Sequence, residues 1–200
     1  MQARGGAAEM LFLGDGGKVA QLAQFQAGMV GHGLISDNTA KLIVKNSKFL
    51  AVNTQLNASN LGFHVISKYF GANLITINEN ELRHELRNKT DDVILLLKKL
   101  SKKLRSIYTN VTCGKAGAHI YNSSKDKIIN CPAFATKVID KVGTGDSMLA
   151  LLAISIYKKF DVNFSMFLSA LAAAYNIQYM ANRTPLNKTN ITKAAQSYLK

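Results

Sequence analysis

The chain has 200 residues, 48% of them hydrophobic, and a formal net charge of +13 at pH 7. This length fits one domain of ordinary size, and the apolar content is sufficient for a substantial buried core. Two cysteines are too few for a disulfide framework, and there is no uninterrupted run of about 18 apolar residues that would cross a membrane. We therefore expect no membrane association and a reducing, cytoplasmic setting.

Segments of strand length alternate with segments of helix length along most of the chain. Residues 1–27 are the exception, because they are rich in Gly, Ala and Gln and show no steady hydrophobic period. After them, hydrophobic spacing and capping residues predict, in chain order, a helix at 39–46 capped by Asp37, a strand at 49–52, a helix at 60–69, a strand at 73–77, helices at 79–87 and 91–103, a strand at 107–111, a hairpin of strands at 118–121 and 127–129, a long apolar helix from 146, and helices at 163–180 and 190–199.

This alternation predicts an α/β fold in which helices cover both faces of a mostly parallel sheet. In such sheets, ligands bind at the carboxyl ends of the strands. Four predicted strands are followed there by polar or loop-forming residues, namely Asn53 with Thr54, Asn78 with Glu81, Thr112 with Gly114, and the glycine-containing segment after Ile139. We expect these four strand ends to converge on one crevice.

The most informative stretch is IDKVGTGDSMLALL at residues 139–152. Gly143, Thr144 and Gly145 allow the backbone to approach a ligand closely, and the helix that follows points unpaired N–H groups and its positive dipole end into the loop. This arrangement predicts an anion site. A carboxylate beside such a site repels phosphate, so Asp146 should have a chemical task, and we interpret it as a general base. The alternative is an ordinary turn with Asp146 as a helix cap.

Asn78 and Glu81 lie one helical turn apart, just after the strand at 73–77. An amide and a carboxylate on one face of a helix can hold water or Mg²⁺ beside phosphate groups. The alternative is a capping box, in which Asn78 caps the helix and Glu81 bonds back to the cap. Taken alone, the pair favours the capping box.

The segment from Thr112 to Gly117 follows the strand at 107–111 and contains two glycines three residues apart, Gly114 and Gly117. Such a segment forms a tight turn against which a nucleotide can lie. Its alternative is a plain hairpin turn.

The positive charge raises the possibility of nucleic-acid binding. Basic residues are spread along the chain, with one cluster at Lys98, Lys99, Lys102, Lys103 and Arg105. The cluster falls on a predicted helix with a buried stripe, so we interpret these side chains as its solvated face. The stripe consists of Val93, Leu96, Leu97, Leu100 and Leu104. The aromatic residues are not interleaved with the cluster, and a positive charge also suits a protein that handles nucleotides and sugar phosphates. Nucleic-acid binding is therefore the weakest of the functional hypotheses.

The three motifs together resemble those of carbohydrate kinases of the ribokinase (PfkB) type. The family's N-x-x-E motif is matched at 78–81, its T-x-G-x-x-G turn at 112–117, and its D-x-x-G-x-G-D signature at 140–146, beginning with Asp140. All three occur in the family's order. The stretches VNTQLNASNLGFHVISKY and FATKVIDKVGTGDS are most similar to kinase domains related to the ADP-heptose synthases, in which a sugar kinase is often joined to a nucleotidyltransferase. The resemblance covers roughly residues 28–200.

The resemblance implies a three-layer αβα fold and ATP-dependent phosphoryl transfer to a hydroxyl of a sugar or sugar phosphate. Asp146 would be the base that deprotonates the acceptor, and the amides of Gly143, Thr144 and Gly145 would form the anion hole. Asn78 and Glu81 would help to place Mg²⁺ through the phosphates or water. The nucleotide would be bordered by Thr112, Gly114 and Gly117.

The family's sugar-binding N-terminal half is not recognisable in this sequence, so we expect residues 28–200 to be the C-terminal part of a kinase domain truncated at its N-terminus. Related kinases carry an aspartate at the position of Met29, and an acid at the position of Asn53. The alternative function is therefore a catalytically impaired or fragmentary module that binds a nucleotide or sugar phosphate. Further expected partners are a nucleotidyltransferase domain or protein and a second copy of the chain.

Overall fold

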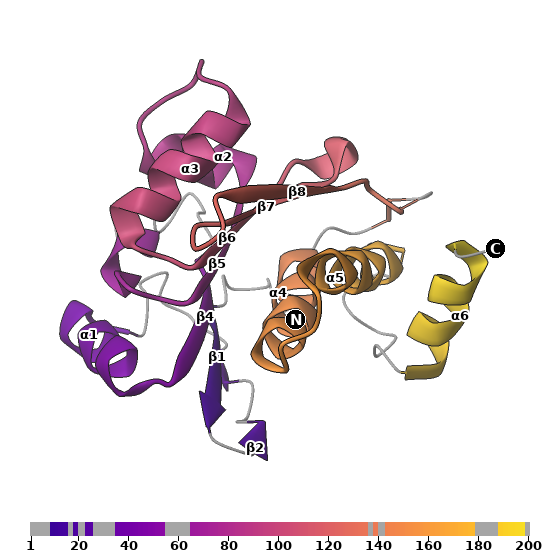
Figure 1. Cartoon of the computed structure of the whole chain (residues 1–200), viewed down its shortest axis with the longest axis horizontal. Coiled ribbons are helices and arrows are strands. Elements are labelled where there is room, and N and C mark those ends of the chain that lie inside the picture. The colour runs from indigo at the N-terminus through magenta and orange to yellow at the C-terminus, as the bar shows by residue number, and fades with distance from the viewer. Residues whose placement is uncertain are drawn as a thin grey trace, which may run out of the picture. The chain divides into compact units, whose positions relative to one another are not determined.

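The computed structural model of this chain describes residues 9–15, 18–19, 23–25, 35–54, 65–135, 138–139, 143–178 and 188–198. The chain divides into two compact units. Unit 1 comprises Met1–Val111 and Tyr121–Lys127, and unit 2 comprises Thr112–Ile120 and Ile128–Lys200. Figure 1 labels most of their helices and strands. Within the described ranges, no helix has both the length and the apolar character needed to span a membrane.

The sheet has the strand order β2-β1-β4-β5-β6-β7-β8, and β3 also pairs with β1. The strands are β1 (Glu9–Asp15), β2 (Lys18–Val19), β3 (Ala23–Phe25), β4 (Phe49–Asn53), β5 (Leu74–Asn78), β6 (Tyr108–Thr112), β7 (Ala118–Asn122) and β8 (Lys127–Cys131). Strand β1 is antiparallel to β2, β3 and β4, whereas β4 and β5 are parallel, with Val52 opposite Ile75. The strands predicted at 49–52, 73–77, 107–111, 118–121 and 127–129 are therefore confirmed to within two residues at their ends. The fourth expected strand end, at Ile139, is wrong, because Val138 and Ile139 are not part of a strand.

Strands β4 and β5 are apolar without alternation because both of their faces are covered. The three central residues of β4 and the first four of β5 are buried. Near-continuous apolar runs of this kind are typical of parallel strands inside α/β proteins. The amide oxygen of Asn73, just before β5, accepts the Leu50 N–H at 2.7 Å and so helps to align the two strands at their start.

The helices of unit 1 are α1 (Asp37–Asn46), α2 (Glu79–Glu85) and α3 (Val93–Leu104). The prediction that Asp37 caps α1 is wrong. Ser36 is the N-cap, and its hydroxyl accepts the Thr39 N–H at 3.2 Å. Asp37 is instead in the first turn, where its charge still suits the helix dipole.

The first half of the helix predicted at 60–69, residues 60–64, lies outside the described residues. Its described end, Ile66–Tyr69, is a short 3₁₀ helix, η1, rather than an α-helix. Gly71 follows η1 with a φ of +91°, a conformation that ends a helical run.

Helix α3 separates apolar and basic side chains onto two faces. Leu96, Leu97, Leu100 and Leu104 are buried, as predicted, although Val93 is only partly covered. On the other face, the ammonium groups of three lysines bond to carboxylates of unit 1, in the pairs Lys98–Asp126 at 2.8 Å, Lys99–Asp91 at 2.7 Å and Lys103–Glu85 at 2.7 Å. The basic cluster is a solvated helix face, and part of its charge is neutralised within the chain.

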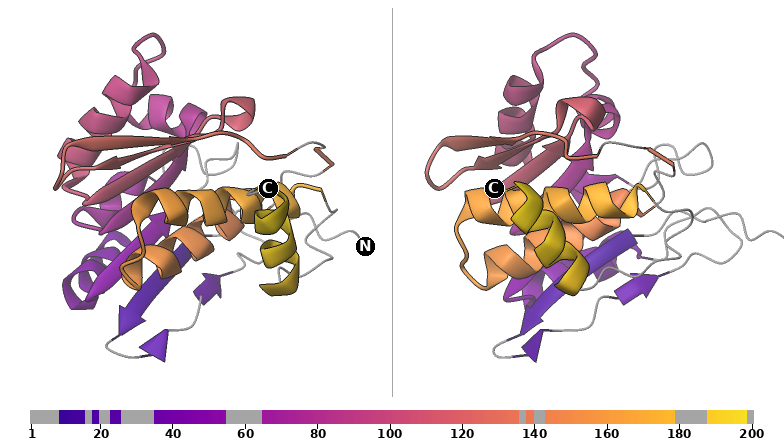
Figure 2. Two further views of the ribbon diagram at one scale, coloured as in Figure 1. Left: turned by 45° about the vertical axis from the view of Figure 1, so that its right-hand side comes forward. Right: turned by 90° about the vertical axis from the view of Figure 1, so that its right-hand side faces the viewer.

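Unit 2 contains helices α4 (Thr144–Tyr157), α5 (Val162–Asn176) and α6 (Lys188–Tyr198). Helices α4 and α5 pack side by side, as both views of Figure 2 show in orange. Asp161 caps α5 by accepting the N–H groups of Asn163 and Phe164. Many of the buried residues of α5 are Ser or Ala, which allow close helix packing. The predicted end of α5 at 180 is too late, because the described helix stops at Asn176.

We predict that shortening a buried leucine of α3 destabilises the chain far more than shortening an exposed one. Leu100 is 0% exposed and Leu95 is 47% exposed on the same helix. Leu100→Ala should lower the free energy of unfolding by about 2–5 kcal/mol, through lost burial and a residual cavity. Leu95→Ala should change it by less than about 0.5 kcal/mol. Urea unfolding followed by circular dichroism measures both, and equal losses would contradict this assignment of the core.

Candidate functional site

The start of α4 is a helix N-terminus with no side-chain cap. Gly143 is the N-cap residue, with φ +74° and ψ −1°, a left-handed conformation that favours glycine. The helix begins at Thr144, so the N–H groups of Thr144, Gly145 and Asp146 have no partner within the helix. Three N–H groups at the positive end of a fourteen-residue helix form a site that suits an anion. Asp140, the first residue of the predicted signature, lies outside the described residues.

Asp146 lies in the first turn of α4 and is half-buried. Burial raises the pKa of its carboxyl above the ordinary value, because a low-dielectric environment disfavours the charged form. The interpretation of Asp146 as a helix cap is wrong, since Gly143 occupies the cap position. A half-buried carboxylate with a raised pKa is suited to accept a proton.

The hydroxyl of Thr144 also lies at this helix start. Its Oγ1 is buried, and no hydrogen-bond partner for it is found among the described residues. A buried hydroxyl without a partner is costly in free energy, and a bound anion is one group that would satisfy it. The residues present therefore fit a phosphate group.

A side chain that sequence reasoning missed, Asn176, reaches the same loop from the last residue of α5. Its Nδ2 donates to the Ser147 hydroxyl at 2.7 Å and to the Gly143 carbonyl oxygen at 3.2 Å. Ser147 donates to that same carbonyl from its backbone N–H and from its hydroxyl, both at 3.0 Å. The only sequence signal was an asparagine at the end of an otherwise apolar helix, a position that usually exposes its side chain, whereas Asn176 is 5% exposed.

Asn78 and Glu81 form the capping box that their spacing favoured. The Asn78 side chain accepts the Glu81 N–H, and the Glu81 carboxylate accepts the Asn78 N–H, both at 2.9 Å. Glu81 is 6% exposed, so its charge is largely removed from water. The capping interpretation is confirmed. A role in placing Mg²⁺ stays a prediction, and among the described residues no group of three or more His, Cys, Asp or Glu side chains could hold a metal ion.

The segment after β6 is a tight turn built on two glycines. A short 3₁₀ helix, η2 (Gly114–Ala116), is closed by a bond from the Cys113 N–H to the Gly117 carbonyl at 2.8 Å. Gly114 has φ +57°, and Gly117 has φ +89° with ψ −137°. A Cβ atom on Gly117 would lie 2.1 Å from the carbonyl oxygen of Cys131. The turn therefore lies against β8 at a distance that only glycine permits.

The three motifs are divided between the two units. The glycine turn at 112–117 and the start of α4 belong to unit 2, whereas Asn78 and Glu81 belong to unit 1. The convergence of all strand ends on one crevice accordingly stays a prediction. At the end of β4, Thr54 is buried and Asn53 is partly covered, and Met29 lies outside the described residues.

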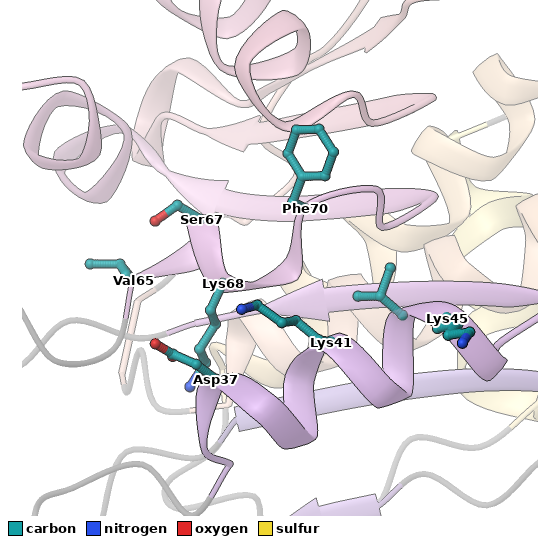
Figure 3. Close-up of a pocket in the computed structure, with 8 residues that line it drawn as sticks. Asp37, Lys41, Lys45, Val65, Ser67, Lys68 and Phe70 are labelled. Carbon is teal, nitrogen blue, oxygen red and sulfur yellow. The ribbon is translucent and has the colours of Figure 1, made fainter.

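A separate pocket of about 580 Å³ lies between α1 and η1 in unit 1. Its lining residues, drawn in Figure 3, are Asp37, Lys41, Val44, Lys45, Val65, Ser67, Lys68 and Phe70. The Lys68 ammonium donates to the carbonyl of Ile35 at 3.2 Å and thereby ties η1 to the segment before α1. None of the motif residues lines this pocket, so we place the candidate site at the start of α4.

Comparison with known proteins decides the family. A family model described as pfkB family carbohydrate kinase matches residues 35–189. The chain belongs to the pfkB carbohydrate kinase family. That match includes the capping box at 78–81, the glycine turn at 112–117 and the start of α4.

Relatives of this pfkB family chain include two bacterial proteins named Bifunctional protein HldE. The protein from Campylobacter fetus subsp. fetus is 31% identical over 147 residues, which cover 72% of this chain and 31% of the relative. The protein from Helicobacter pylori (strain ATCC 700392 / 26695) is 33% identical over 120 residues, which cover 58% of this chain and 25% of the relative. The chain thus spans about a third or less of the length of these relatives.

Solved structures confirm the fold class. Ribokinase from Thermotoga maritima matches with a TM-score of 0.66 at 15% identity, over 88% of this chain and 65% of that one. Phosphofructokinase-2 from Escherichia coli, in complex with potassium, matches with a TM-score of 0.68 at 14% identity, over 83% and 54%. The fold is therefore the three-layer α/β fold of ribokinase-like kinases, as the family resemblance implied.

We predict that the two glycines of the turn respond very differently to alanine. Gly117→Ala should lower the free energy of unfolding by about 2–5 kcal/mol, because the new Cβ meets a backbone carbonyl and the φ is strained. Gly114→Ala should cost only about 1 kcal/mol, since no atom lies within 4 Å of its Cβ position and only the left-handed φ is unfavourable. Thermal unfolding of both variants measures the difference. A Gly117→Ala variant as stable as Gly114→Ala would contradict the close approach to β8.

Proposed function

We propose that this pfkB family chain takes part in ATP-dependent phosphoryl transfer to a hydroxyl of a sugar or sugar phosphate. Membership in a carbohydrate kinase family supports this class of reaction. The observation that carries the proposal is the start of α4, where Gly143 in a left-handed conformation leaves three N–H groups without helical partners and Asp146 stands in the first turn.

The chemistry needs positioning and charge stabilisation more than covalent participation by the protein. In the proposal, the amides of Gly143, Thr144 and Gly145 stabilise the charge that develops on the transferred phosphoryl group. Those of Thr144 and Gly145 are two of the three uncapped N–H groups of α4, and that of Gly143 comes from the N-cap residue itself. Asp146 accepts the proton of the attacking hydroxyl. The raised pKa of Asp146 supports this role, because a more basic carboxylate is a better acceptor of that proton.

The remaining motif residues are assigned to the nucleotide and its metal ion. Thr112, Gly114 and Gly117 would border the nucleotide. Gly114 is exposed and has no atom within 4 Å of its Cβ position, which supports an approach of the nucleotide on that side of the turn. Asn78 and Glu81 would place Mg²⁺ through phosphate oxygens or water, in keeping with the small number of protein ligands that Mg²⁺ usually takes beside phosphates. When bound, Mg²⁺ neutralises phosphate charge.

The names of two relatives support a narrower proposal for the acceptor. Two of them are named bifunctional proteins, and the sequence resembles kinase domains related to the ADP-heptose synthases. We therefore extend the proposal to a heptose phosphate as acceptor, to a nucleotidyltransferase as a domain or partner, to a homodimer and to a cytoplasmic location.

A second candidate is a module that binds the nucleotide or sugar phosphate without turning it over. One observation favours it. The described end of β4 carries Asn53 where related kinases carry an acid. Calorimetry with ATP and Mg²⁺ that shows binding, together with no consumption of ATP in the presence of heptose phosphates, would support this candidate over the kinase.

We predict that Asp146→Asn separates binding from catalysis. The substitution keeps the shape of the side chain but removes the proton acceptor, so turnover with the best acceptor should fall by about 100-fold to 10,000-fold. ATP affinity should be retained or increased, since a negative charge beside the phosphates is lost. A coupled ADP-release assay measures turnover and calorimetry measures affinity. Turnover at the wild-type rate would rule out Asp146 as the base.

We predict that the same substitution stabilises the fold at neutral pH. Burial raises the pKa of Asp146 in the folded chain, so the folded state holds this proton more tightly than the unfolded state. The stability it contributes is fully present below the unfolded pKa and is lost as the pH rises through the folded pKa. The melting temperature of Asp146→Asn should therefore exceed that of the wild type at pH 7, and the gap should shrink as the pH falls through that range. A gap that does not depend on pH would contradict this effect of burial.

We predict that Glu81→Gln distinguishes capping from metal placement. Glutamine also completes a capping box, so the melting temperature should change little. If the carboxylate helps to place Mg²⁺, the Mg²⁺ concentration for half-maximal turnover should rise several-fold. Asn78→Ala serves as the comparison for stability alone, because it removes the cap and should cost about 1 kcal/mol. An unchanged Mg²⁺ dependence in Glu81→Gln would limit Glu81 to its structural role.

A further inference from the structure

The side-chain amide of Asn176 acts on the backbone of the loop, and the proton directions in its hydrogen bonds are fixed. Asn176 Nδ2 can only donate, and it donates to Ser147 Oγ at 2.7 Å and to the Gly143 carbonyl at 3.2 Å. Because Ser147 Oγ accepts from Asn176, its own proton is directed to the Gly143 carbonyl at 3.0 Å. With the Ser147 N–H, three donors hold one carbonyl oxygen.

The orientation of that carbonyl determines where the first N–H group of α4 points. The Gly143 carbonyl and the Thr144 N–H belong to the same peptide plane, and in a trans peptide they point in opposite directions. Since the carbonyl is turned toward Ser147 and Asn176, the Thr144 N–H is turned away from them. Gly143 itself does not impose this orientation, because a glycine adopts positive and negative φ with similar ease.

We propose that Asn176 is a positioning residue that locks the Gly143–Thr144 peptide with its N–H group facing the transferred phosphoryl group. The inference rests on the proposed function of this loop. Asn176 itself does not touch the phosphoryl group in this assignment. It acts through the Gly143 carbonyl and Ser147, and together they prevent the peptide from rotating so that a carbonyl oxygen would face the anion.

The lock should matter most when charge develops on the phosphoryl group, that is, in the transition state. Loss of one properly directed donor in such a site typically costs about 100-fold to 1,000-fold in turnover. Ser147 still holds the carbonyl when Asn176 is changed, so we expect a smaller loss, about 10-fold to 100-fold in kcat. The KM for the sugar acceptor should stay within about twofold of the wild-type value. The lock acts on the transition state and not on binding of the acceptor in the ground state.

The test compares two Asn176 variants with a control on the same helix end. Asn176→Ala removes the amide, and Asn176→Asp keeps its shape but sets a carboxylate oxygen against the Gly143 carbonyl. Gln178→Ala is the matched control, because its amide donates to the Ala174 carbonyl within the helix at 3.0 Å and not to the loop. Calorimetry with ATP and Mg²⁺ gives affinity, the ADP-release assay gives kcat and KM, and circular dichroism gives the melting temperature.

We expect both Asn176 variants to lose kcat by about tenfold or more, with Asn176→Asp the more affected, while Gln178→Ala behaves as the wild type. The effect of Asn176→Ala should also be larger in a Ser147→Ala background, because the Ser147 hydroxyl then no longer holds the same carbonyl. Full kcat in both Asn176 variants, or losses that simply add to that of Ser147→Ala, would overturn the inference.

Two further outcomes keep the inference separate from protein stability and from the proposed function. If the Asn176 variants do not fold, NMR of the wild type tests the lock instead. The measurement is a scalar coupling across the hydrogen bond from Asn176 Nδ2 to the Gly143 carbonyl, recorded before and after ATP is added. Absence of this coupling in both states overturns the lock. A wild-type chain that neither binds ATP nor turns it over overturns the proposed function as well. ATP binding and turnover that are the same in the wild type and the Asn176 variants overturn the lock alone.

Discussion

The candidate site depends on three backbone N–H groups at the start of α4 that no side chain of the helix satisfies. Most helices cap such groups with Ser, Thr, Asp or Asn, and this one begins with glycine instead. The cost of leaving them uncapped is offset elsewhere in unit 2, where α4 buries six side chains against its surroundings. The packing of α4 thus stabilises a helix whose first N–H groups lack hydrogen-bond partners. Such N–H groups are available to bind an anion.

Two electrostatic effects act on Asp146 at the start of α4, and they have opposite signs. The helix dipole favours negative charge, and half-burial of Asp146 disfavours its ionised form. A phosphate group and the Asp146 carboxylate compete for the same positive end of α4. A proton arriving on Asp146 from an acceptor hydroxyl would relieve that competition as the phosphoryl group becomes more negative, so the electrostatics of the loop favour the direction of the proposed proton transfer.

Sequence patterns predicted the elements that hydrophobic periodicity and local capping determine. The strands β4 and β5, the stripe of α3 and the capping box at Asn78 are of this kind, because each depends on residues within a few positions of one another. The cap of α1 was misassigned because Ser36 and Asp37 are adjacent and both suit the position. Asn176 was missed for a different reason: its partners are 29 and 33 positions away in the sequence, and only the packing of α5 on α4 brings them together. Family resemblance identified the loop but not the residue that holds it.

The lengths of α4 and α5 determine where Asn176 lies along the hairpin of the two helices. The helices have 14 and 15 residues and are joined by four, so α5 returns over about the same distance, roughly 21–22 Å, that α4 covers. The return brings the last residue of α5 level with the first turn of α4. One residue inserted into α5 would carry Asn176 about 1.5 Å along the axis and about 100° around it, away from Gly143. The lengths of α4 and α5 are therefore constrained as strictly as the identity of the loop residues, because both place Asn176 beside Gly143.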